Sequence, residues 1–106
     1  MPKYLFEAHY TTGGAKGLAH EGGTGRRSAV STMIEALGGK LETFYYAFGD
    51  VDVYVIVDVP DSITAAAIAL AVNQSGGATV KTVVLIPPED VDQAGKKAVA
   101  YRPPGH

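Results

Sequence analysis

The sequence predicts a single α+β domain with one four-stranded antiparallel sheet and the element order β-α-β-β-α-β. Three observations support this fold class. The chain has 106 residues, which suits one domain. Hydrophobic residues make up 46% and charged residues 19%, as in ordinary globular proteins. Finally, runs with strand and helix periodicity alternate along the chain, separated by glycines and prolines.

The first strand is expected over residues 4–11, where apolar and polar residues alternate and aromatic residues are frequent. Gly13-Gly14 marks its end. Because strand side chains alternate between faces, one face carries Tyr4, Phe6, Ala8 and Tyr10, and the other carries Leu5, Glu7 and His9.

Residues 13–25 are rich in glycine, which disfavours one continuous helix and predicts turns or a short broken helix. A regular helix is predicted from about Arg26 to Leu37, ended by Gly38-Gly39. Its apolar positions at helical spacing are Val30, Met33, Ile34 and Leu37.

Two β-rich runs, 40–48 and 51–59, are predicted to form a hairpin through the two-residue connection Gly49-Asp50. Pairing of Phe48 with Val51 places an apolar set on the face that helices must cover: Phe44, Tyr46, Phe48, Val51, Val53, Val55 and Val57. The opposite face carries Thr43, Tyr45, Ala47, Asp52, Tyr54 and Ile56.

A second helix is expected to about residue 73, capped by Asp61 or Ser62, followed by a fourth strand over residues 78–86. Pro88 opens a short helix through about Ala98, and residues 101–106 have no regular pattern. We therefore expect a domain over residues 1–95 and a basic, proline-containing C-terminal tail over 96–106.

This element order is the ferredoxin-like arrangement. Right-handed crossovers place the first strand between the third and the fourth. Two helices cover one face of the sheet and leave the other face open. Exposure of an apolar and aromatic face of this size to water is unfavourable. We therefore expect a homodimer or higher assembly over the open face, which includes Leu5, Tyr45, Tyr54, Ile56, Val83 and Leu85.

Charge and composition exclude several classes of function. The net charge of -2 disfavours nucleic acid as a partner, and no apolar run is long enough to cross a membrane. The absence of cysteine removes disulfides and thiolate metal sites, and the few histidines give too few ligands for a metal. We expect a cytoplasmic protein with no cofactor.

The open face also carries the polar residues that suit acid/base chemistry. His9, Asp52 and Lys81 are predicted to lie at one end of the sheet, with Tyr54 and Tyr45 one step along and Glu7 beside His9 on its strand. A carboxylate keeps an imidazole basic, and a tyrosine can donate to a developing oxyanion. His9 and Asp52 are thus a candidate base and its orienting group, Tyr45 and Tyr54 candidate donors, and Glu7 and Lys81 candidate substrate contacts. The alternative is that these groups pair across a dimer interface.

The glycine-rich run before the first regular helix supplies a further candidate, Arg26, as an anchor for an anionic substrate. The run lacks both the P-loop and the dinucleotide-binding glycine pattern. The alternative is a flexible helix entry in which the arginines are solvated or pair with Glu21 and Glu35.

Taken together, the motifs of the chain resemble the GYD domain family from Tyr4 to Ala94. The residues that carry the resemblance are Gly38-Gly39-Lys40-Leu41-Glu42, Phe44-Tyr45, Phe48-Gly49-Asp50, Asp52, Val57, Pro60-Asp61 and Val80-Lys81-Thr82. Val51 stands where the family's name-giving triplet has an aromatic residue. The resemblance implies a ferredoxin-like fold of the dimeric α/β-barrel type. Its wider relatives include monooxygenases, isomerases and decarboxylating enzymes, and the family itself has no settled activity.

The leading hypothesis is a small dimeric protein that binds an aromatic or carbonyl-containing molecule in a cleft between the open sheet face and the helices or a partner. Whether it catalyses a reaction stays open; a reaction is expected to be cofactor-independent acid/base chemistry. The alternative is a non-catalytic assembly or regulatory module. The tail either straps across a partner through Val99 and Tyr101 or is disordered.

Overall fold

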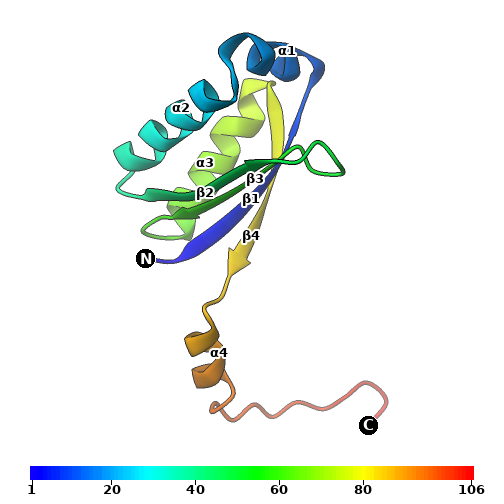
Figure 1. The fold of residues 1–106 in the computed structure, drawn as a ribbon. Coiled ribbons are helices and arrows are strands. Elements are labelled where there is room, and N and C mark those ends of the chain that lie inside the picture. Colours follow the sequence, from blue (N-terminus) through cyan, green and yellow to red (C-terminus); the bar gives the residue numbers. More distant parts are fainter.

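The computed structural model describes residues 1–106 and contains one sheet and four helices (Figure 1). The elements, in order, are β1 (Lys3–Tyr10), α1 (Thr12–Glu21), α2 (Gly23–Ala36), β2 (Lys40–Tyr46), β3 (Val53–Asp58), α3 (Ser62–Ser75), β4 (Ala78–Leu85) and α4 (Pro88–Ala94). The fold is α+β and ferredoxin-like, with an additional short C-terminal helix, as the sequence predicts.

The four strands are antiparallel and lie in the order β2-β3-β1-β4. The predicted central place of the first strand, between β3 and β4, is confirmed. Helices α2 and α3 lie over the same face of the sheet (Figure 1). Helix α2 packs on the outer strand β2, and α3 packs on the other outer strand, β4.

The alternation predicted for the two central strands is confirmed, because every second residue faces the helices and is buried. The buried core comprises Tyr4, Phe6, Ala8, Ile34, Val53, Val55, Val57, Val59, Ala65 and Ile68. Only 12 of 106 residues are buried, so the isolated chain has a small core for its length.

The glycine-rich segment forms a broken helix rather than turns. Gly22 separates α1 from α2 with φ at 90°, a left-handed conformation that interrupts the helical hydrogen bonds. Helix α2 then starts at Gly23, earlier than the expected start at Arg26. Glycine weakens a helix without preventing it, and packing on β2 and α1 compensates for that cost.

The predicted antiparallel pairing of β2 with β3 is confirmed, but the predicted two-residue connection between them is wrong. Strand β2 ends at Tyr46 and β3 begins at Val53, so residues 47–52 form a longer connection. The predicted register is correct next to this loop, where Tyr46 pairs with Val53. Phe48 is not paired with β3, and its φ is 55°. Its side chain is 65% exposed and stacks on the Tyr46 ring rather than entering the core.

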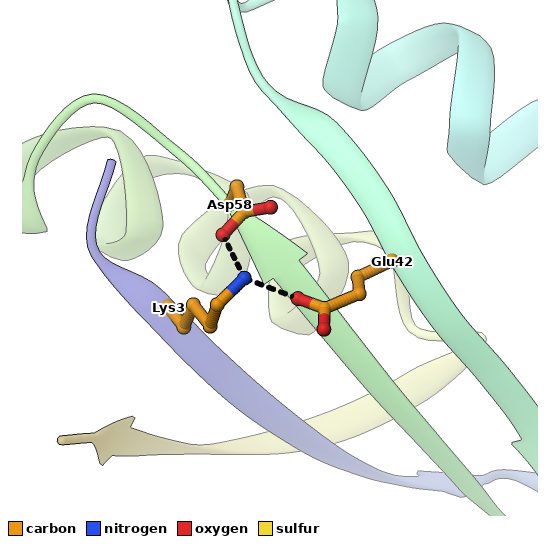
Figure 2. Close-up of polar contacts among 3 residues, drawn as sticks. All are labelled: Lys3, Glu42 and Asp58. Atoms are coloured by element: carbon orange, nitrogen blue, oxygen red, sulfur yellow. Dashed lines mark hydrogen bonds and ion pairs between the residues drawn. The ribbon is translucent and has the colours of Figure 1, made fainter. Parts of the chain in front are cut away.

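A β-bulge lies in β2, where the register between β2 and β3 shifts between Leu41 and Thr43. The extra residue, Glu42, accepts a hydrogen bond of 2.6 Å from Lys3 Nζ, which also donates to Asp58 at 2.7 Å. Figure 2 shows the Lys3 ammonium between the two carboxylates, which come from different strands. The hydrogen bond with Asp58 and then that with Glu42 raise the pKa of Lys3. These charges connect three strands at one end of the open face.

Helix α3 begins as predicted at an acidic cap. The Asp61 carboxylate accepts hydrogen bonds from the Thr64 N–H and hydroxyl, both at 2.8 Å, and these bonds lower the pKa of Asp61. The C-terminal helix α4 ends at Ala94, before the expected residue 98, because Gly95 follows and no neighbouring element packs on it. Beyond α4 the chain has no helix or strand.

Candidate functional site

A cavity of about 540 Å³ lies between the helix-covered face of the sheet and helices α1, α2 and α3. Seventeen of its 23 lining residues are hydrophobic. The central strands contribute Phe6, Ala8, Tyr10, Val53, Val55 and Val57 to this lining. The volume lies within the range of about 300–1,000 Å³ that small-molecule sites occupy.

The position of the cavity follows from how the helices pack. Helices α2 and α3 pack on the outer strands β2 and β4, so the central strands β1 and β3 lie beneath the space between the helices. The small residues of α1 and α3 in the lining, such as Gly17 and Ala71, do not fill that space. The helices thus form walls around a hollow over the middle of the sheet.

Polar groups gather at one end of this cavity, where β1 ends and α2 begins. Tyr10 is the last residue of β1 and lines the cavity with its half-buried side chain. Tyr46, the last residue of β2, donates its hydroxyl to the Gly23 carbonyl at 3.1 Å. Burial raises the pKa of both tyrosines, and the nearby Tyr46 hydroxyl contributes to raising that of Tyr10 to about 12. The Tyr46 hydroxyl already donates to the Gly23 carbonyl, so Tyr10, which lines the cavity, is the candidate donor to a ligand.

Arg26 and Glu21 complete this polar end and also line the cavity. Arg26 Nε lies 3.5 Å from Glu21 Oε1, too far for a strong hydrogen bond, and it is buried without a hydrogen-bond partner. Both side chains are partly exposed, so they lie at the rim between cavity and solvent. A buried N–H without a partner is unfavourable, which leaves Arg26 with a donor available to an acceptor on a ligand.

The raised pKa of Tyr10 predicts a loss of stability at alkaline pH. The unfolded chain loses the Tyr10 proton near pH 10.0, and the folded chain near pH 12, so stability falls as pH rises between these values. We expect the ultraviolet absorbance titration to contain a late tyrosinate step that Tyr10→Phe diminishes. Tyr45→Phe, which changes an exposed tyrosine on the other face, serves as control. An unchanged titration in Tyr10→Phe would contradict the placement of Tyr10.

Most of the sequence-predicted site residues lie on the open face. Tyr45 pairs with Tyr54, which pairs with Glu7, which in turn pairs with Lys81. These four side chains form one row across all four strands, with Tyr45 71% and Tyr54 38% exposed. The sequence argument placed Lys81 at the same end of the sheet as His9, and in the structure Lys81 is opposite Glu7, two residues from Thr79, which is opposite His9.

His9 and Asp52 lie at the end of this face and have different partners. The His9 ring donates from Nε2 to the Asp50 carbonyl. The Asp52 carboxylate accepts from the Tyr10 N–H at 2.8 Å, and the Asp52 N–H donates to the Ala8 carbonyl at 2.9 Å. Within one chain, Asp52 therefore holds the end of β1 and the backbone of Tyr10, and no hydrogen bond joins it to His9.

The predicted site residues are thus divided between two faces, with Arg26 alone lining the cavity. The sequence argument missed Tyr10 and Tyr46, and it named Glu21 only as a possible partner of the arginines. A signal was present for the two tyrosines, because both were assigned to the helix-covered face, where a hydroxyl requires a polar partner. The predicted pairing of an arginine with Glu21 is confirmed for Arg26. That both residues line a cavity depends on how α1 and α2 pack, which has no local signal in the sequence.

Two further features of the chain bear on its chemistry. The structure contains no cluster of three or more His, Asp or Glu side chains arranged to hold a metal ion. None of its helices has the length and apolar character needed to cross a membrane.

Comparison with protein families matches residues 4–94 to the GYD domain. No curated protein and no solved structure matches the chain significantly. The match covers all of the sheet except Lys3, the helices around the cavity and the polar residues at its rim. The chain therefore belongs to the GYD domain family.

Proposed function

We propose that this protein binds a small aromatic or carbonyl-containing molecule in the cavity between the sheet and its helices. The observation that carries the proposal is an apolar cavity of about 540 Å³ with the buried Arg26 Nε, which has no hydrogen-bond partner, at one end. Protein interiors are close-packed, with few voids larger than a water molecule. An apolar ligand in this cavity would remove its apolar lining from water, which favours binding.

The rim residues suit a ligand with a carboxylate or polarised carbonyl at one end. Arg26 supplies a guanidinium whose Nε–H lacks a partner, and Tyr10 supplies a protonated hydroxyl. Glu21 is the only carboxylate in the lining. If the protein turns its ligand over, these groups provide cofactor-independent acid/base chemistry, with Glu21 as base and Tyr10 as donor.

The test is a thermal-shift screen of small aromatic carboxylates, each matched with its neutral amide, followed by titration of the hits. We expect Arg26→Gln to weaken binding of a carboxylate about 10-fold or more, because hydrogen bonds to charged groups contribute about 1.5–3 kcal/mol. Binding of the matched amide should change much less.

Two matched variants locate the ligand. Arg27→Gln removes the neighbouring, exposed arginine of α2, which does not line the cavity, and should leave affinity unchanged. His9→Ala alters the opposite face and should also leave affinity unchanged. Loss of binding with His9→Ala, with Arg26→Gln neutral, would move the site to the open face around Asp52. No hit for any compound class would refute the proposal.

We also propose that the protein forms a homodimer through its open sheet face. The supporting observation is the exposure of apolar and aromatic side chains on that face, including Tyr45, Tyr54 and Val83, beside a core of only 12 buried residues. In this arrangement the polar side chains of the same row, Glu7 and Lys81, pair with groups of the second copy.

Light scattering coupled to size-exclusion chromatography tests this interface. We expect a mass of at least twice 11.0 kDa for the wild-type chain and a lower mass for Tyr54→Arg, which adds a charge at the centre of the face. Ala19→Arg adds the same charge at an exposed position of α1, away from the open face, and serves as control. A wild-type mass of 11.0 kDa at high concentration would exclude this dimer.

A further inference from the structure

Helix α3 has an unusual composition for a helix at a protein surface. It contains no charged residue, and apolar side chains occur all around it. One side carries buried Ala65 and Ile68, whereas Ile63 and Leu70 are 79% and 63% exposed. A helix that is hydrophobic on all sides is normally buried on all sides. The outer face of α3 therefore lacks a covering element.

An apolar groove lies beside this face, between α2 and α3. Its volume is about 320 Å³, and all six lining residues are hydrophobic: Met33, Ala36, Leu37, Ala67, Ile68 and Ala71. Two of the six, Ala67 and Ala71, belong to the exposed part of α3. The groove and the outer face of α3 thus form one continuous apolar surface, which we call the α3 surface.

The C-terminal arm, residues 86–106, has apolar side chains that no other part of the chain covers. All of its residues are exposed, including every residue of helix α4. Val99 and Tyr101 are 78% and 72% exposed, and the Tyr101 N–H donates to the Val99 carbonyl at 3.0 Å. A seven-residue helix without packing partners is marginal in water. The arm therefore has apolar side chains and a short helix that need another surface.

The direction in which the arm leaves the domain and the charge of its last residues indicate which surface the arm contacts. Figure 1 shows α4 and the tail leading away from the sheet and helices, and the radius of gyration of 16.8 Å exceeds the roughly 13 Å of a compact chain of this size. Within the arm, residues 96–106 carry Lys96, Lys97 and Arg102 and no acidic residue, whereas α4 carries Glu89, Asp90 and Asp92. Residues 1–85 carry eight acidic and six basic residues, so the basic end of the arm is complementary in charge to the domain. One of these acidic residues, exposed Glu35, is adjacent in sequence to groove residue Ala36.

We propose that the arm docks on the α3 surface of a second copy of this chain, with Val99 and Tyr101 in the groove between α2 and α3. The basic residues of the arm then lie beside acidic groups of the partner, including Glu35. This contact uses the helical side of the molecule, whereas the proposed dimer uses the open sheet face. The groove and the ligand cavity share Met33, Ile68 and Ala71 in their linings, so the arm and the ligand contact opposite sides of the same packed side chains.

Disulfide trapping tests the docking directly, because the wild-type chain has no cysteine. Ala100→Cys places a thiol between the two arm anchors, and Ala67→Cys places one in the groove of a second chain with a different affinity tag. Both changes are small, and both positions are exposed, so folding is preserved. Ala15→Cys on α1 is the matched control away from the groove.

After mild oxidation of an equimolar mixture, we expect at least a tenfold higher yield of the cross-linked pair with Ala67→Cys than with Ala15→Cys. Adding Tyr101→Ser to the arm variant should reduce this yield several-fold. Equal yields with the two partners would overturn the proposal. So would a double variant, Ala67→Cys with Ala100→Cys, that cross-links only within one chain at all concentrations, since the arm would then fold back on its own groove.

Discussion

Gly14→Ala is expected to destabilise the protein by about 3 kcal/mol, near the upper end of the usual cost of overpacking. A Cβ at Gly14 would lie 1.7 Å from the Gly77 carbonyl oxygen, so the backbone itself must move. The same carbonyl accepts a hydrogen bond of 3.0 Å from the Thr11 N–H. The substitution therefore separates the start of α1 from the turn before β4, and chemical denaturation measures the loss.

Gly17→Ala is the matched control in the same helix. No atom lies within 4 Å of a Cβ built at Gly17, and alanine favours helix by up to about 1 kcal/mol over glycine. We expect Gly17→Ala to be neutral or stabilising. If both variants lost the same stability, close contact at Gly14 would not be the cause.

Ile34→Ala is expected to lower the free energy of unfolding by about 2–3 kcal/mol and the Tm by about 10 °C. Ile34 is 1% exposed and joins α2 to the core. The loss lies toward the lower end of the range for such truncations because Ile34 also lines the cavity, so part of its side chain already lacks packing partners.

Ile86→Ala removes the same atoms from a side chain that is 64% exposed, and its free energy of unfolding should change by less than about 0.5 kcal/mol. Thermal and urea unfolding of both variants check the pair. A ligand that fills the cavity should raise the Tm of the wild-type chain. An equal loss in the two isoleucine variants would contradict the assigned core.

Much of the fold could be read from local patterns. The alternation in β1 and β3 assigned Phe6 and Val55 to the core side, because a strand with one buried face must place apolar residues at every second position. The crossover rule predicted the central place of β1. The Asp61 cap could also be predicted from the sequence, because it depends only on contacts between residues three apart.

The loop between β2 and β3 was misread for a physical reason. Gly49-Asp50 is a good turn sequence, but turn propensity is weak compared with contacts that reach the loop from elsewhere. The Asp50 carbonyl accepts from the His9 ring, and the Asp52 carboxylate accepts from the Tyr10 N–H. These bonds draw residues 47–52 toward the end of β1 and take Phe48 out of the ladder.

In the candidate site, too, some features can be predicted from the sequence and others depend on the tertiary structure. Periodicity alone assigned Tyr10 and Tyr46 to the helix side and His9 to the open side, because side chains in a strand alternate between faces. Sequence distance could not indicate that Arg26 lines a cavity with Glu21 or that the helices stand over the outer strands. A cavity depends on the separation between packed elements, and that separation is a sum of many contacts between residues far apart in the chain.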